Sequence, residues 1–203
     1  MGQYFALANT SRKEVLYSPI GIQKLFEWGA NFLPRLTLGY LLQGSWNCDR
    51  IALIGDYNEK RLTWSDIGRW KEVFPEKEGA GTDGREIRIY LSLKKKGFPF
   101  APVYFCLDRN EYISADEIGG DKTNVLGALI YLLAYSYGKE DEEAPHSWAF
   151  CKIEARETKP KGAVSVSETA KELLKADKTF KEKGIFEGWK EAMEERVSDY
   201  LNI

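Results

Sequence analysis

Apolar and polar positions along the first part of the chain follow a pattern typical of a mixed α+β protein. Tyr4–Asn9 and Glu14–Tyr17 predict two strands joined by a polar turn, which together make a hairpin. Apolar residues then recur at helical spacing, which predicts helices between the hairpin and Gly44. Arg50–Ile54 follows as a strand with apolar side chains on both faces.

A similar succession returns in the second half of the chain. Val103–Asp108 and Glu111–Ile113 predict another hairpin. Asn124–Tyr137 predicts an apolar helix, and Trp148–Ala155 predicts a closing strand. The proposed equivalent positions are Asn9 and Asp108, Glu14 and Glu111, Leu16 and Ile113, Tyr40 and Tyr131, and Trp46 and Trp148.

The shared order and spacing predict an α+β fold of duplicated β-β-α-β units around one shared mixed or antiparallel sheet, with C-terminal helices packed on it. The alternative is that two unrelated α+β segments share Trp and Glu landmarks by chance. Because such a unit buries little apolar surface alone, we expect the two copies to share a core about a pseudo-two-fold axis.

The segments outside the two copies carry their own signals. Thr63–Asp66 resembles a capping box that opens a helix to about Phe74. Ile87–Leu93 alternates apolar and polar side chains, which predicts a strand with one buried face. A second capping box at Ser165–Glu168 and an apolar stripe over 185–201 predict two C-terminal helices, packed on the sheet or on a partner.

These elements divide the chain into four segments within one compact domain. We expect the first copy at residues 1–60 and a connecting helix and strand at 61–100. The second copy then occupies 101–158, and the C-terminal helical segment 159–203.

Composition narrows the functional classes. The 43% hydrophobic content of the 203 residues excludes a disordered chain. A net charge of -2 gives no general attraction to nucleic acid or to anionic membranes, so we expect neither as a partner. The longest apolar run, Val125–Tyr137, is too short to cross a bilayer.

Residue usage also bears on the compartment and the source. Cys48, Cys106 and Cys151 are odd in number and widely spaced, which favours neither a zinc site nor a disulfide framework and points to the cytoplasm. Abundant Glu and Lys with only three Gln residues favour a heat-adapted source.

One resemblance to known proteins covers about the first 57 residues. The residues that carry it are Met1-Gly2-Gln3-Tyr4, Asn9, Lys13-Glu14, Trp46, Asp49-Arg50-Ile51 and Gly55-Asp56-Tyr57. They are similar to a group of uncharacterised bacterial and phage proteins that begin M-G-Q-Y-Y and contain a W-x-G-D-R-I…G-D-Y segment. Cys48 departs from the glycine usual in that segment, and Asn110–Ile113 gives a weaker echo. The resemblance implies a mobile-element or viral source and carries over no catalytic role.

Few residues offer chemistry. The single histidine, His146, lies five residues from Cys151, and a Cys-His dyad there competes with a simple surface histidine. Asp49, Asp56 and Asp108 are the candidate catalytic carboxylates, because facing copies could bring Asp49 and Asp108 together. The alternative is that these aspartates have only structural roles, at the ends of strands and in turns.

Two matching acids have a structural interpretation. Glu14 and Glu111 occupy equivalent places in the two hairpins, and we expect ion pairs to Arg50 and Lys152 of their own copies.

We therefore expect a non-enzymatic protein-interaction module of mobile-element or viral type. The alternative is a hydrolase or nuclease with a carboxylate site between the copies. Trp189, Met193 and Val197 on the C-terminal stripe are the candidate partner-binding residues, for another protein or for self-association. No metal or cofactor is expected.

Overall fold

The computed structural model describes residues 4–18, 24–58, 61–75, 81–98, 100–135, 147–176 and 185–201. The strands are β1 (Phe5–Asn9), β2 (Glu14–Tyr17), β3 (Asp49–Gly55), β4 (Lys71–Glu72), β5 (Val103–Cys106), β6 (Glu111–Ser114), β7 (Ala134–Tyr135), β8 (Cys151–Arg156) and β9 (Val164–Ser165). The helices are α1 (Leu25–Ala30), α2 (Phe32–Leu42), α3 (Trp64–Ile67), α4 (Gly81–Lys95), α5 (Ala115–Ile118), α6 (Asn124–Leu133), α7 (Ser167–Ala176) and α8 (Ile185–Leu201).

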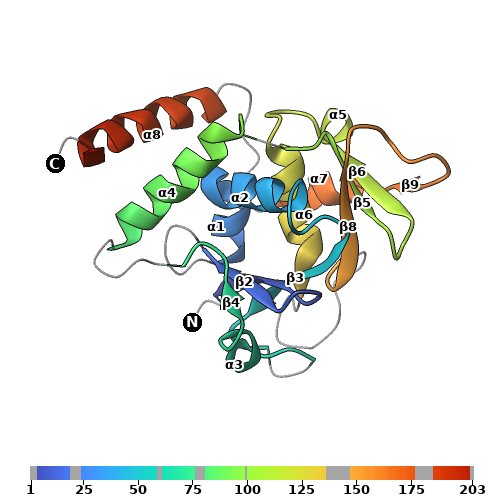
Figure 1. Ribbon diagram of the computed structural model, residues 1–203. Coiled ribbons are helices and arrows are strands. Elements are labelled where there is room, and N and C mark those ends of the chain that lie inside the picture. The colour runs from blue at the N-terminus through green and yellow to red at the C-terminus, as the bar shows by residue number, and fades with distance from the viewer. Residues whose placement is uncertain are drawn as a thin grey trace.

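The strands form one mixed sheet in the order β4-β2-β1-β3-β8-β5-β6-β9, and β7 pairs with β3 beside this path (Figure 1). The pairs β2–β4, β6–β9 and β3–β7 are parallel, and the other pairs are antiparallel. The α+β class and the mixed sheet are therefore confirmed.

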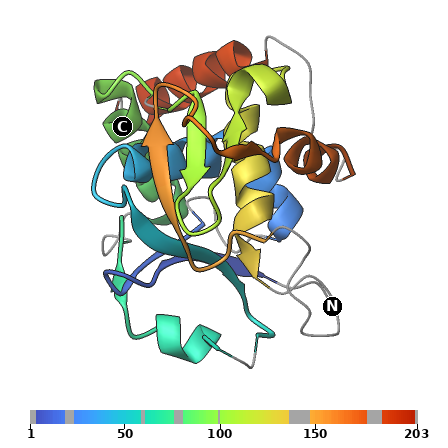
Figure 2. The ribbon, with the colours of Figure 1, turned by 90° about the vertical axis from the view of Figure 1, so that its right-hand side faces the viewer.

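The longer helices lie on one side of the sheet, and α3 lies on the other (Figures 1 and 2). The main core fills the space between the sheet and the long helices. All ten residues of α6 are buried, and its apolar side chains belong to this core. A smaller cluster forms under α3 on the opposite face and includes Ala8, Ala52, Ile54 and Ile67. We call the α3 side of the whole sheet the outer face.

The predicted strand at 87–93 is wrong, because these residues belong to α4. Ile89, Tyr90 and Leu93 are buried along one side of this helix, while Leu91 is 38% exposed. The apolar positions of this run fit the spacing of a helix as well as that of a strand. Packing of α4 between α2 and α8 stabilises the helix. The adjoining lysines, Lys94 and Lys95, form its last turn.

The capping box at Thr63 is confirmed, but its helix is shorter than predicted. Thr63 Oγ1 accepts from the Asp66 N–H at 3.2 Å, and Asp66 Oδ2 accepts from the Thr63 N–H at 3.0 Å. The helix ends at Ile67, and the chain then pairs as β4 with β2, as in the Lys71–Glu14 pair.

The C-terminal helices pack differently from one another. α7 lies against α6 and β6, whereas α8 lies on α4 rather than on the sheet. The side chain of Glu194 on α8 accepts from Tyr90 Oη at 2.8 Å and pairs with Lys94 at 2.6 Å. In the described ranges, none of the helices combines the length and apolar character that a membrane crossing requires.

The two hairpins have turns of equal length. Asn9 lies opposite Glu14 in the first hairpin, and Cys106 lies opposite Glu111 in the second. If the two glutamates correspond, Asn9 therefore corresponds to Cys106. The predicted match of Asn9 with Asp108 is wrong by two residues.

Candidate functional site

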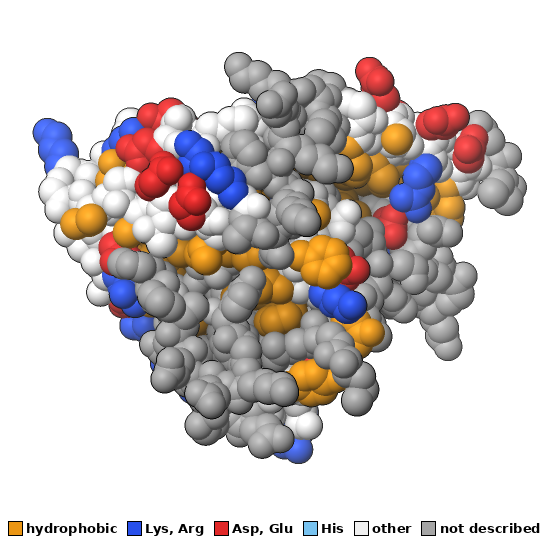
Figure 3. Space-filling view, turned by 180° about the vertical axis from the view of Figure 1, so that it is seen from behind, with side chains coloured by type: hydrophobic (Ala, Val, Ile, Leu, Met, Phe, Trp, Pro, Cys, Tyr) orange, Lys and Arg blue, Asp and Glu red, His pale blue; other side chains and the backbone are white. Residues whose placement is uncertain are grey.

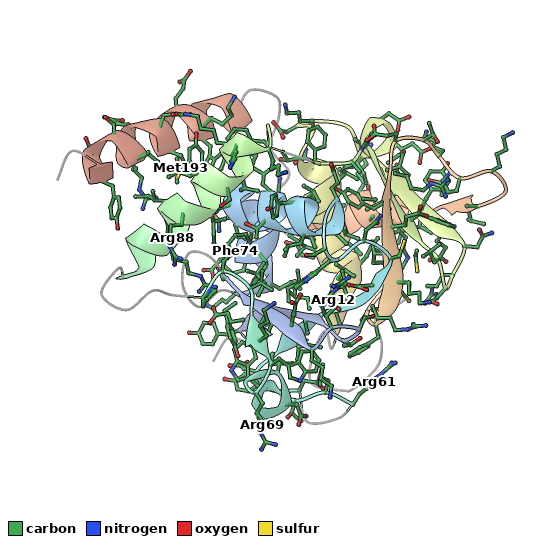
Figure 4. The ribbon with its side chains drawn as sticks, viewed as in Figure 1. Arg12, Arg61, Arg69, Phe74, Arg88 and Met193 are labelled. Atoms are coloured by element: carbon green, nitrogen blue, oxygen red, sulfur yellow. The ribbon has the colours of Figure 1, made fainter. Side chains whose placement is uncertain are left out.

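A polar cluster lies where the first hairpin meets β3. Buried Asn9 donates from Nδ2 to Oδ2 of Asp49 at 2.9 Å. Arg12, labelled in Figure 4, places its Nε 2.5 Å from the same oxygen. The hydrogen bond and the charge of Asp49 raise the pKa of Arg12. Asp49 is thus a structural acceptor that fixes the turn against β3.

A buried indole lies beside this cluster. Trp46 donates from Nε1 to Oε2 of Glu14 at 2.8 Å, and Lys71 Nζ lies 2.8 Å from the other carboxylate oxygen. The Lys71 hydrogen bond, with help from Trp46, lowers the pKa of Glu14. A buried Trp N–H needs an acceptor, and the hairpin supplies it.

The second half contains the same pair of residue types in the same relation. Trp148 is fully buried and donates from Nε1 to Oε2 of Glu111 at 2.8 Å. Arg109 Nε lies 3.2 Å from that oxygen. The expected ion pairs of the two glutamates with Arg50 and Lys152 are therefore wrong, because tryptophan and nearer cations hold both carboxylates.

Arg50 instead joins the two halves across the outer face. Its Nη1 and Nη2 lie 2.8 Å and 3.2 Å from the two carboxylate oxygens of Asp108. The backbone N–H of Lys152 also donates to Asp108, at 2.8 Å. Because both oxygens of Asp108 are occupied, this aspartate orders the turn after β5.

The three candidate carboxylates do not converge. Asp49 precedes Arg50 on β3, so their side chains point to opposite faces, and Asp108 lies with Arg50. Asp56 accepts from the backbone N–H of Tyr4 at 3.0 Å. Within the described segments, no group of three or more His, Cys, Asp or Glu side chains is placed to hold a metal ion.

The candidate partner-binding residues on α8 face the rest of the molecule. Met193, labelled in Figure 4, and Val197 are buried. The Trp189 ring is partly buried and lies 5.7 Å, centroid to centroid, from Tyr90 and 5.5 Å from Phe32. These side chains attach α8 to α4 and α2.

Two of the three thiols lie near one another. Cys106 is buried on β5, Cys151 is partly exposed on β8, and Cys48 is exposed before β3. The hydrogen bond between the Cys106 and Cys151 thiols lowers the pKa of Cys151 and raises the pKa of Cys106. His146, the suggested base for Cys151, lies outside the described residues.

Sequence reasoning missed a buried arginine. Arg35 of α2 donates from Nε to the Gly29 carbonyl and from Nη1 to Oδ1 of Asn124 at 3.1 Å. Burial lowers its pKa to about 10. Its guanidinium packs on Gly127 of α6, where an added Cβ would lie 2.9 Å from Arg35 Cζ. The signal in the sequence is an arginine inside the otherwise apolar run of α2.

The described surface exposes several large hydrophobic side chains. Seen from behind, hydrophobic side chains of all sizes lie in the middle of the described surface (Figure 3). The exposed large hydrophobics are Tyr4, Phe26, Tyr57, Leu91, Leu107, Val164 and Tyr200.

Comparison with known proteins identifies no relative whose function could guide the interpretation of these residues. No protein-family model, curated protein or solved structure matches this chain.

Proposed function

We propose that this chain is a non-enzymatic protein-interaction module built from two copies of a β-β-α-β-β-α unit. The strand order supports the duplication. It is β4-β2-β1-β3 in one half and β9-β6-β5-β8 in the other, with the same parallel and antiparallel pairs.

The pairing of β3 with β8 supports a pseudo-two-fold axis. Arg50 lies directly opposite Lys152. The spacing of 102 residues that relates Trp46 to Trp148 also relates these two residues. Equivalent residues that face each other in an antiparallel pair require an axis between them.

Unusual backbone conformations recur at matching places. Lys13 and Asn110, each just before a hairpin glutamate, have φ of 53° and 55°. Cys48 and Phe150, each two residues after a landmark tryptophan, have φ of 61° and 64°. Because positive φ is uncommon outside glycine, this agreement supports common ancestry of the halves over chance.

One difference between the halves supports an interaction function. In the first half, Trp64, Ile67 and Trp70 cover the outer face. In the second half, no described helix lies over that face (Figure 2), where Phe105 and Tyr112 lie opposite each other in the strand pair. Neighbouring side chains leave Phe105 only 8% exposed, and Tyr112, whose hydroxyl donates to Glu117 of α5, is the more accessible of the two rings. The uncovered outer face of the second half is the observation that carries the proposal.

The charges on this face suggest the chemistry of a partner. Lys152, Glu154 and Arg156 alternate along β8 and so share the face with Phe105. Glu154 pairs with Arg156, and the Arg156 guanidinium lies 5.7 Å from the centroid of the Phe105 ring. Arg50 is paired with Asp108 and Arg156 with Glu154, so the charge of Lys152 is left to give the face a net positive character that suits an acidic protein surface. The resemblance of the first 57 residues to bacterial and phage proteins supports a mobile-element or viral setting.

Charge reversal tests this function. Wild type, the double variant Lys152→Glu with Arg156→Glu, and the control Lys175→Glu on α7 are used to capture proteins from the source cells. We expect an acidic protein that wild type and control retain and that the double variant binds about tenfold less, since that corresponds to about 1.4 kcal/mol. Equal recovery of every captured protein by all three chains contradicts the proposal.

A further inference from the structure

Cys106 and Cys151 lie on neighbouring antiparallel strands and on the same face of the sheet. Cys106 of β5 is directly opposite Ile153 of β8. Cys151 precedes Ile153 by two residues, so its side chain points to the same face as that of Ile153. The two cysteines are therefore diagonal neighbours, on the side of the sheet that the long helices cover.

An equivalent diagonal pair in the first half of the chain, Asn9 and Asp49, shows that side chains in this relation can touch. Asn9 lies opposite Ile51, and Asp49 precedes Ile51 by two residues. Nδ2 of Asn9 is 2.9 Å from Oδ2 of Asp49. The same step in the strand pairing relates Cys106 to Cys151, and the mutual influence of the two thiols on their pKa values agrees with direct contact.

The two thiols have different surroundings. Cys106 is fully buried, whereas Cys151 is partly exposed at the start of β8. The hydrogen bond from Cys106 lowers the pKa of Cys151, and the positive charges of Arg109 and Arg50 act in the same direction, against burial and the charge of Asp108. The interaction with Cys151, together with burial, raises the pKa of Cys106. Cys151 is thus the accessible thiol of the pair, with the larger thiolate fraction, and Cys106 is the buried thiol behind it.

We propose that Cys106 and Cys151 form a reversible redox pair, in which a peroxide oxidises Cys151 and Cys106 then closes a disulfide. Hydrogen peroxide is the simplest member of this oxidant class. The pair would make the join between β5 and β8 sensitive to peroxide, and a small dithiol would restore both thiols.

The electron balance needs one peroxide for each disulfide. The Cys151 thiolate attacks one peroxide oxygen, the O–O bond breaks, and Cys151 becomes a sulfenic acid as the departing hydroxide takes a proton to form water. The Cys106 sulfur then attacks the Cys151 sulfur, the S–O bond breaks, and the hydroxyl leaves with the Cys106 proton as a second water. The two cysteines lose two electrons, and the peroxide gains them.

The test oxidises the reduced full-length chain with hydrogen peroxide and maps cysteine-containing peptides by mass spectrometry. We expect wild type and Cys48→Ser to lose two hydrogen atoms and to yield a linked Cys106–Cys151 peptide that a dithiol separates. Cys106→Ser should instead accumulate a Cys151 sulfenic acid that dimedone traps. A linked peptide that contains Cys48, or oxidation of Cys151 beyond sulfenic acid without any disulfide in wild type, overturns the proposal.

A second measurement needs no variant in the core. Native, reduced wild type is alkylated with iodoacetamide at neutral pH, and the labelling rates of Cys151 and Cys48 are compared. Burial raises the pKa of Cys48, although its side chain is the more exposed of the two. We expect Cys151 to react several-fold faster, since the thiolate is the nucleophile. Faster labelling of Cys48 contradicts the assignment of Cys151 as the peroxide-reactive residue.

Discussion

The indole N–H groups of Trp46 and Trp148 each donate to a glutamate from the hairpin of the same half. Each contact joins the loop before a central strand to the turn of a hairpin, and both indoles are fully buried. An unpaired buried donor or acceptor costs about 1–3 kcal/mol, so these contacts fix the position of each hairpin.

Replacing Trp46 tests this role. Trp46→Phe removes the donor, leaves Oε2 of Glu14 without its indole partner and reduces core volume, so we expect a loss of about 2–4 kcal/mol in the free energy of unfolding. Trp64→Phe on the outer face is the matched control, because that ring is only partly buried, and it should lose about 1 kcal/mol or less. Urea denaturation measures both. Equal losses contradict the role of the Trp46 contact.

Acid sensitivity can be assigned to Glu117 of α5. Burial acts to raise its pKa, but hydrogen bonds from Lys159, Ser165 and Ser167 outweigh it and lower the pKa from 4.5 to about 2. The folded chain therefore binds the Glu117 proton less readily than the unfolded chain. The contribution of this group is complete above the unfolded pKa and disappears as the pH falls through the folded pKa.

The corresponding experiment compares wild type with Glu117→Gln by urea denaturation over a range of pH. We expect the variant to be less stable at neutral pH, and the difference to shrink between 4.5 and about 2. A difference that is constant over this range contradicts the proposed pKa.

At the scale of elements, the sequence predicts the hairpins and central strands well, because their alternation and turn residues are local signals. It fails at α4, where the run over 87–93 alternates and also fits a helix. The helix forms because α2 and α8 bury Tyr90 and Leu93 along one side, which only tertiary structure reveals. The contact between Arg35 and Gly127 was equally hidden, since 92 residues separate them.

The packing of α6 on α2 depends on a glycine. An added Cβ at Gly127 would lie 2.9 Å from Cζ of Arg35, whose side chain is buried. We expect Gly127→Ala to lower the free energy of unfolding by about 1–3 kcal/mol through overpacking. Gly188 of α8 has open space around the added Cβ, so Gly188→Ala should be neutral or stabilise by about 0.5–1 kcal/mol. Thermal unfolding measures both, and a neutral Gly127→Ala would contradict tight packing there.

At the scale of the whole molecule, the two proposed copies meet along β3 and β8, and they differ in what covers the outer face. The sequence indicated the mixed α+β class, and the duplication that it suggested remains a proposal. It also suggested that Asp49 and Asp108 meet, but strand alternation places them on opposite faces. The lack of a covering helix on the second half of the outer face was not predicted, because such a lack leaves no pattern in a sequence.

The most direct test of an interaction function is hydroxyl-radical footprinting of the chain, free and bound to its captured acidic partner. We predict that binding protects the partly exposed Tyr112 on the outer face of the second half and leaves Trp64 and Trp70, which are also partly exposed, unchanged. Unchanged oxidation of Tyr112, with protection confined to Trp189 or other residues of α8, would contradict the assignment of the partner surface.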